Sequence, residues 1–361
     1  MRAASPICCA NWCGRPRAVR LAEDHAIRLP LTQFEPADTL GLTSVYIDHV
    51  PPRAARGFLD AASRRSIAVQ ASARGLIMEF GASIFFTDYS ISPAELAIAL
   101  EERGFESLWV AEHSHIPVPR RTPAPGGGEL PKRYYDVMDP FVTLSVAAAV
   151  TKRLKLGTGV CLVIQRDTIQ TAKLVASIDQ VSNGRFLFGI GGGWNAEEIE
   201  NHGTEFTSRF KKMREQIEAM KEIWTKERAE YHGELIDFPP MMAWPKPVQK
   251  PHPPIIVGGA FQYAARRAIR YGDGLIPQAA EAGSGQPEEY MPRFRRMAEE
   301  AGRDPRSLSV TLGGAPEDPE RLKRYHDIGI ARMNVRLPPA KSDEILPVLD
   351  RWARLIPQVQ G

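Results

Sequence analysis

Hydrophobic positions in residues 78–361 follow two alternating spacings. Short runs rich in Val, Ile, Leu and Phe are typical of buried strands, and each is followed by a longer run whose apolar residues recur every three or four positions, as on an amphipathic helix. The alternation predicts strands at 79–86, 105–111, 153–161, 185–190, 254–258, 273–277, 308–312 and 330–335. It predicts helices near 92–103, 139–151, 168–182, 209–226, 260–272, 286–302, 318–327 and 341–356.

Several of these helices have a recognisable first turn. Ser92-Pro93, Asp139-Pro140 and Asp318-Pro319 each combine a capping side chain with a proline at the first helical position. Eight strand-then-helix units predict a (β/α)8 TIM barrel. A doubly wound open sheet is the competing architecture.

The first 77 residues differ from the rest of the chain. Stretches such as 51–56 and 63–66 are rich in Pro, Ser and Arg and have no sustained helical or strand period. We therefore divide the chain into a poorly structured N-terminal extension, 1–77, and a barrel domain, 78–361. The extension is either inert, with translation beginning at Met78, or an arm for targeting or partner binding.

Composition and charge narrow the class of protein. With 43% hydrophobic residues the chain has enough apolar material for a large core. The net charge of +3 is uneven, because residues 1–77 contain ten Arg and six acidic residues, whereas the remaining 284 residues contain 36 basic and 37 acidic groups. The barrel therefore lacks the basic surplus of a nucleic-acid-binding domain. Its apolar runs are shorter than the roughly 18–20 residues of a membrane span, so we expect a cytoplasmic protein without membrane contact.

The cysteines do not indicate a metal site. Cys8, Cys9 and Cys13 lie in the extension, and Cys161 stands alone in an apolar run. This spacing matches neither a zinc site nor a disulfide framework, so we expect no metal.

The exit of the second predicted strand concentrates titratable groups. TIM barrels carry their chemistry on the loops that leave the C-terminal ends of the strands. Here Glu112, His113 and His115 follow one strand, and an imidazole beside a carboxylate suits general acid–base work near neutral pH. Because Glu112 and His113 project to opposite faces of a continuing strand, only one should meet a substrate. His113 is the candidate catalytic residue; the alternative is an ordinary hydrogen-bonded histidine.

A long connection, 114–138, follows this strand. It is rich in Pro and Gly and contains Arg120, Arg121, Tyr134 and Tyr135. Loops of this length in compact domains are typically lids or binding loops, and these side chains would suit an anionic ligand. A solvated loop is the alternative.

Glycines mark the next three strand exits. They lie within strand three, at Gly157 and Gly159, after strand four, at 191–193, and after strand five, at Gly258-Gly259. Glycine in a strand indicates a bulge or the close approach of a ligand. The last pair runs directly into a helix whose exposed amides could bind phosphate, although a tight turn explains it too. No Gly-x-Gly-x-x-Gly dinucleotide motif is formed after strand four.

These motifs together resemble the luciferase-like monooxygenase superfamily, and more narrowly its branch that uses the deazaflavin coenzyme F420. The resemblance covers about residues 78–350 in order. It rests on Trp-Val-Ala-Glu-His at 109–113, Leu-Gly-Thr-Gly-Val at 156–160, Gly-Arg-Phe at 184–186, Gly-Gly-Gly-Trp-Asn at 191–195, Tyr-His-Gly at 231–233, the proline-rich 245–254, Val-Gly-Gly at 257–259 and Tyr-Gly-Asp-Gly at 271–274.

The resemblance implies a role for each matching position. Glu112 would contact the cofactor and His113 would act as acid or base. A non-proline cis peptide would lie at Gly159–Val160, behind the cofactor ring. The ring or its ribityl chain would be lined by Gly191, Gly192, Gly193 and Asn195. The cofactor phosphate would be bound by Gly258, Gly259 and Ala260.

One departure from the family concerns the proton donor. Several deazaflavin enzymes of the superfamily have an acidic residue in the loop after strand four, but this chain has no carboxylate there before Glu197. His113 consequently carries more of the mechanistic hypothesis.

The resulting expectation is an oxidoreductase that transfers a hydride between a small organic substrate and F420. An FMN-dependent monooxygenase is the alternative enzyme, and a non-catalytic flavin-binding or deazaflavin-binding barrel is the alternative of another class. A homodimer is expected by analogy alone. Arg336, at the eighth exit, is either an anchor for an anionic substrate group or a surface residue.

Overall fold

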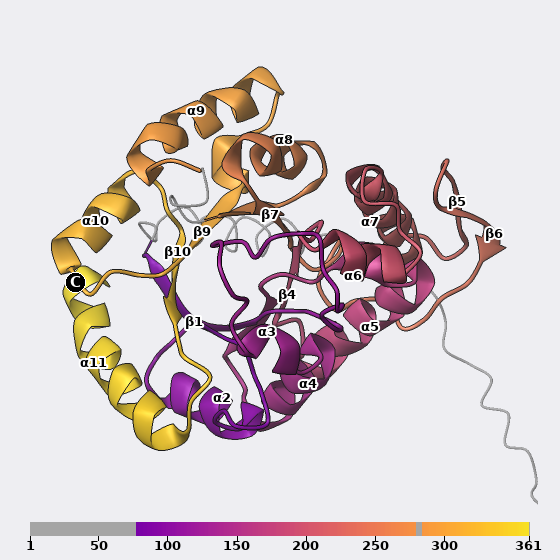
Figure 1. Cartoon of the computed structure of the whole chain (residues 1–361). Coiled ribbons are helices and arrows are strands. Elements are labelled where there is room, and N and C mark those ends of the chain that lie inside the picture. Colours follow the sequence, from indigo (N-terminus) through magenta and orange to yellow (C-terminus); the bar gives the residue numbers. More distant parts are fainter. Residues whose placement is uncertain (1–76, 279–283, 361) are drawn as a thin grey trace, which may run out of the picture. The chain divides into compact units, whose positions relative to one another are not determined.

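Eight parallel strands close into a barrel, and helices surround it (Figure 1). The computed structural model describes residues 77–278 and 284–360, and everything below refers to these residues. The strands neighbour one another in the order β1-β10-β9-β8-β7-β4-β3-β2, with β1 paired to both β10 and β2. The barrel prediction is confirmed and the open sheet is wrong. The barrel strands are β1 (Glu79–Ile84), β2 (Ser107–Val110), β3 (Lys155–Thr158), β4 (Phe186–Ile190), β7 (Ile255–Gly259), β8 (Gly274–Pro277), β9 (Ser309–Gly313) and β10 (Arg332–Arg336).

The predicted helices begin where their caps indicate. Asp139 accepts hydrogen bonds from the backbone N–H groups of Phe141 and Val142, and the Ser92 and Asp318 side chains cap their helices in the same way. The large helices are α2 (Pro93–Glu102), α4 (Pro140–Val150), α5 (Thr168–Val181), α7 (Arg209–Thr225), α8 (Phe261–Tyr271), α9 (Pro287–Glu300), α10 (Pro319–Asp327) and α11 (Ser342–Gln360). Two 3-10 turns are η1 (Val163–Gln165) and η3 (Pro305–Ser307).

Buried apolar side chains form two separate clusters in the barrel. The main core lies between the strands and the surrounding helices. A smaller cluster of Trp109, Leu187 and Ile256 forms a separate core, and the Trp109 indole N–H donates to Ser107 Oγ at 2.8 Å. This packing holds the strand ends, and therefore the loops that leave them, in fixed positions.

Four short strands and helices were not predicted from the sequence. Strands β5 (Ala229–His232) and β6 (Asp237–Met241) form an antiparallel hairpin, and they were missed because they are only four and five residues long and β6 contains two prolines. The helices α3 (Arg133–Asp136) and α6 (Ala196–Asn201) are each shorter than two turns and have too few positions to establish a period.

Neither the N-terminal extension nor most of the cysteines can be compared with the structure. The extension 1–77, apart from Ile77, and Cys8, Cys9 and Cys13 lie outside the described residues. Within the described ranges, no helix combines the length and the apolar character that crossing a membrane requires.

Candidate functional site

His113 and Glu198 form a buried pair at the C-terminal end of the barrel. His113 follows β2 and Glu198 lies in α6, after β4. The His113 Nδ1 atom is 2.8 Å from Glu198 Oε2, and the two side chains are only 6% and 1% exposed. On the other side of the ring, the Trp194 indole N–H donates to His113 Nε2 at 3.3 Å. These partners assign Nδ1 as the donor to the carboxylate and Nε2 as an acceptor.

The environment of Glu198 keeps this carboxylate ionised. Burial alone would raise its pKa, but the hydrogen bond from His113 and the backbone N–H of Ser114, 2.9 Å from Oε1, lower the pKa below its ordinary value. A charged, immobile acceptor therefore fixes the orientation of the imidazole.

Aromatic rings enclose the exposed edge of the imidazole. The ring centroids of Tyr134 and Trp194 lie 5.3 and 5.7 Å from that of His113. Tyr134 belongs to α3, inside the long connection 114–138, and it also lies 5.1 Å from the Phe85 ring. The guanidinium of Arg120, from the same connection, lies 5.4 Å from the Trp194 ring. The connection thus contributes side chains to the site, as a binding loop would.

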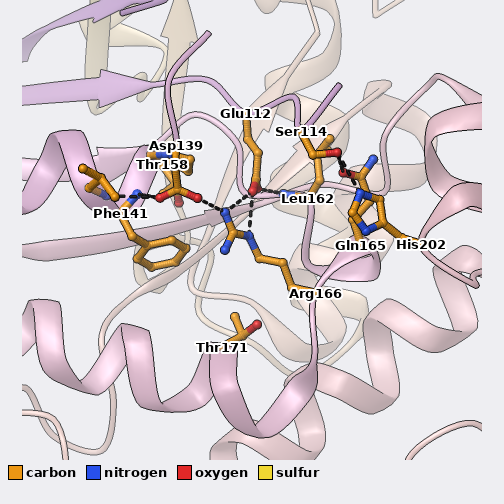
Figure 2. Close-up of polar contacts among 12 residues, drawn as sticks. Glu112, Ser114, Asp139, Phe141, Thr158, Leu162, Gln165, Arg166, Thr171 and His202 are labelled. Carbon is orange, nitrogen blue, oxygen red and sulfur yellow. Dashed lines mark hydrogen bonds and ion pairs between the residues drawn. The ribbon is translucent and has the colours of Figure 1, made fainter. Parts of the chain in front are cut away.

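Glu112 has a different set of partners from its neighbour His113, and Figure 2 shows those of Glu112. Its Oε2 accepts the backbone N–H of Leu162 at 2.6 Å, and its Oε1 accepts the Arg166 Nε at 2.6 Å. Arg166 also bonds Asp139 at 2.5 Å, so a chain of charges links the exits of β2 and β3 to the start of α4. The two adjacent side chains do diverge, as expected. Glu112 positions the β3 exit, and its direct contact with a cofactor stays a prediction.

Three glycine-containing exits converge on Val160. The Gly159–Val160 peptide is cis, as the resemblance implied. A Cβ added to Gly191 would lie 2.5 Å from Val160 Cγ2, and one added to Gly258 would lie 2.7 Å from Val160 Cγ1. Real Cβ atoms do not approach so closely, so the exits of β3, β4 and β7 meet only because these positions lack side chains. We call this arrangement of Gly159, Gly191 and Gly258 around Val160 the glycine cradle.

The remaining predicted cofactor residues lie around the glycine cradle. A Cβ on Gly192 would collide with the Phe210 ring, and Gly193 has a positive φ of 64°. Gly259 lies just before the start of α8, and Ala260 is the N-cap residue of that helix. Asn195 is 1% exposed, yet neither polar atom of its amide has a partner among the described residues. A buried amide without partners is costly, which is typical of a site completed by a ligand.

The structure therefore brings most of the sequence-predicted residues to one end of the barrel and adds Glu198 to them. The loop after β4 lacks an acidic residue, as expected, but the first turn of α6 supplies the carboxylate instead. Its signal was its place just after the strand-four exit, near the exit of β2 in a closed barrel. Within the described residues, no group of three or more His, Cys, Asp or Glu side chains is placed to hold a metal ion.

The family model of the luciferase-like monooxygenases matches residues 92–329 of this chain. The chain belongs to this family. Among curated relatives of this luciferase-like chain, an uncharacterised protein of Mycobacterium tuberculosis is 37% identical over 284 residues, which are 76% of this chain and 98% of the relative. The F420-dependent glucose-6-phosphate dehydrogenase of Amycolatopsis mediterranei is 28% identical over 60% of this chain and 62% of its own length.

The barrel fold is also found among solved structures. The coenzyme F420-dependent tetrahydromethanopterin reductase of Methanopyrus kandleri superimposes with a TM-score of 0.60 at 15% identity, covering 79% of this chain and 100% of that chain. At this level of sequence identity the match shows a shared fold, which agrees with the observed barrel.

Proposed function

We propose that this luciferase-like protein is an oxidoreductase that binds coenzyme F420 and transfers a hydride between the coenzyme and a small organic substrate. The observation that carries the proposal is the His113–Glu198 pair beside the glycine cradle around Val160. The F420-dependent relatives support the choice of coenzyme.

The residues present fit a flat, phosphate-bearing cofactor. In the cradle the glycines of the β4 and β7 exits let backbone pack closely against Val160 at the β3 exit, and the unpartnered Asn195 amide offers a donor and an acceptor. In the proposal Gly191, Gly192, Gly193 and Asn195 line the ring and its chain, and Gly258, Gly259 and Ala260 hold the phosphate at the start of α8. Bound deazaflavin would supply the hydride acceptor or donor.

His113 holds or moves the proton in this proposal. Because its Nδ1–H is held by Glu198, Nε2 is the atom that exchanges a proton with the substrate. The indole N–H that now faces Nε2 is at 3.3 Å, which is long for a hydrogen bond to nitrogen, so a substrate hydroxyl could compete for this position. The rings of Trp194 and Tyr134 exclude water from the imidazole.

An FMN-dependent monooxygenase is the second candidate. It is supported by the start of α8, which has no side-chain cap, because the phosphate site proposed there would suit a flavin mononucleotide equally well. It is also consistent with a barrel in complex with FMN, from the oxygenating constituent of a Pseudomonas putida 3,6-diketocamphane monooxygenase, with a TM-score of 0.52 at 19% identity over 69% of this chain and 70% of that chain.

Titration of the purified protein with F420 and, separately, with FMN tests the proposal. We expect F420 to bind and a screen of small organic substrates to bleach its absorbance. The variant His113→Ala should bind F420 with unchanged affinity but lose turnover by about a hundredfold or more, because only the proton-transferring group is removed.

Each other outcome has a defined meaning. Binding of FMN alone would favour the monooxygenase. Tight cofactor binding without any substrate-dependent spectral change would favour a non-catalytic barrel. Failure of both cofactors to bind would refute the proposal, and normal turnover in His113→Ala would remove His113 from the mechanism.

A further inference from the structure

A cavity opens at the exits of β8, β9 and β10. It measures about 240 Å³, and its walls include Gly313 and Gly314 after β9, Arg336 at the end of β10, and Arg321 and Tyr325 of α10. None of the residues assigned above to the cofactor or to proton transfer lines it.

The described residues that line the cavity carry positive charge only. Arg321 and Arg336, both exposed, are the charged ones, and none of the described lining residues is a carboxylate. Arg321 donates its Nε to the Tyr325 hydroxyl at 2.9 Å. The Arg336 side chain has no hydrogen bond or ion pair to any other described residue, although its backbone lies in the ladder between β10 and β1. Two guanidinium groups facing one space without a counterion favour an anionic ligand, because each presents several donors in a planar fork.

Glycine backbone positions the Arg336 side chain. A Cβ added to Gly314 would lie 3.3 Å from Arg336 Cζ, and one added to Gly313 would lie 3.5 Å from an Arg336 terminal nitrogen. Gly314 also has a positive φ of 83°, which disfavours other residues. The guanidinium therefore lies close to backbone that carries no side chains, and glycine at these two positions leaves room for it.

The barrel places this cavity on the same rim as His113. In the strand register Ser83 of β1 pairs with Arg336 on one side and with Trp109 of β2 on the other, and His113 follows four residues after Trp109. Strands β9 and β10 are the seventh and eighth of the barrel, whose exits frequently form a phosphate-binding site in TIM barrels.

We propose that Arg336 and Arg321 bind a phosphate or carboxylate group of the substrate, whose reacting end meets His113. This inference rests on the proposed function, because it extends from the same catalytic rim. It assigns the substrate to the class of small organic anions.

Calorimetric titration with inorganic phosphate and, separately, with acetate tests the anion site. At low ionic strength we expect the wild type to bind one of these probes and Arg336→Gln to bind it about tenfold more weakly or worse, since a charge-assisted hydrogen-bond donor is lost. Arg336→Lys should recover part of the affinity. Arg306→Gln is the matched control, because Arg306 is paired with Asp304 in η3, just before β9 begins.

Preference for phosphate or for acetate would identify the oxyanion, and either preference supports the site. Unchanged affinity in a folded Arg336→Gln, checked by circular dichroism, or no binding of either probe to the wild type, would overturn it. A repeat with F420-saturated protein separates the two sources of an anion. Retained probe binding supports the substrate, whereas displacement would show that acidic groups of the cofactor occupy the cavity and would overturn the assignment.

The two proposals fail separately. Arg336→Gln should bind F420 like the wild type, because it is outside the cradle. If F420 does not bind any form of the protein, the proposed function is refuted even when the probes bind. If F420 binds but the probes do not respond to Arg336→Gln, only the anion site is refuted.

Discussion

The two ends of the barrel place their charged groups in different surroundings. At the N-terminal end, Arg332 and Lys155 meet Glu79 and Glu106. Arg332 lies 2.6 Å from Glu79 and 2.7 Å from Glu106, and Lys155 lies 2.6 Å from Glu106 and 3.2 Å from Glu79. Two cations and two carboxylates balance, and the Arg332 side chain is only 5% exposed.

The C-terminal end is only partly balanced. The pair His113 and Glu198 is complete, but Arg336 faces its cavity without a partner and the Asn195 amide is unsatisfied. The difference teaches where to look for function in this barrel. A closed charge cluster stabilises the fold, whereas charges left without partners at the loop-bearing end are available to a ligand.

Removing Arg332 should have the largest effect on stability. Arg332→Met leaves two carboxylates beside a single lysine, so we expect the free energy of unfolding to fall by about 3 kcal/mol, measured by denaturant titration. F420 affinity should be unchanged in the folded variant. Arg351→Met is the control: its pair with Glu317 is exposed and 3.5 Å long, so its loss should change stability by less than about 1 kcal/mol.

The pH dependence of the same variant gives a second measure. Burial would raise the pKa of Glu106, but Arg332 and Lys155 lower it to about 2, against an ordinary value of 4.5. The stabilisation by this carboxylate is therefore present above pH 4.5 and lost as the pH falls toward 2. The stability difference between wild type and Arg332→Met should narrow over that range. A constant difference would show that these ion pairs do not stabilise the N-terminal end.

Neutralising Glu198 should affect turnover far more than folding. Glu198→Gln keeps the size of the side chain but removes the charge that orients His113, so we expect kcat to fall about a hundredfold with little change in F420 affinity. The free energy of unfolding should change by no more than about 2 kcal/mol. The assay uses whichever substrate the bleaching screen identifies.

Two variants separate positioning by Glu198 from a general structural role. Glu198→Asp retains the charge and should recover part of the activity, and its pH–rate profile should resemble that of the wild type. Glu200→Gln, on the exposed part of the same helix, should be fully active. A Glu198→Gln enzyme that loses stability and activity in parallel would contradict the contrast between the two ends.

Filling the cradle should produce the smallest effect. In Gly258→Ala the new Cβ meets Val160 Cγ1, and we expect a loss of about 1–2 kcal/mol in stability together with weaker F420 binding. Adding Val160→Ala creates room and should restore part of the stability. If the double variant is no more stable than Gly258→Ala alone, Val160 is not what requires a glycine at this position.

Much of the fold could be predicted from local patterns. The eight barrel strands appear within a few residues of their expected bounds, because each buried strand is a short apolar run and several flanking helices have a capping side chain such as Asp139 or Asp318. The hairpin β5–β6 was missed because its strands are only four and five residues long and β6 contains two prolines.

The sequence by itself determined the barrel, the glycine-rich exits and the candidacy of His113, since strand periods, caps and glycines act over a few neighbouring residues. Only the tertiary structure decided which groups meet. It pairs His113 with Glu198, 85 residues away, engages Glu112 with Arg166 and Leu162, and leaves Arg336 without a partner in its cavity. The physical reason is that closing the barrel sets the distances between strand exits, and short-range hydrogen bonds and ion pairs form only between side chains that this closure brings together.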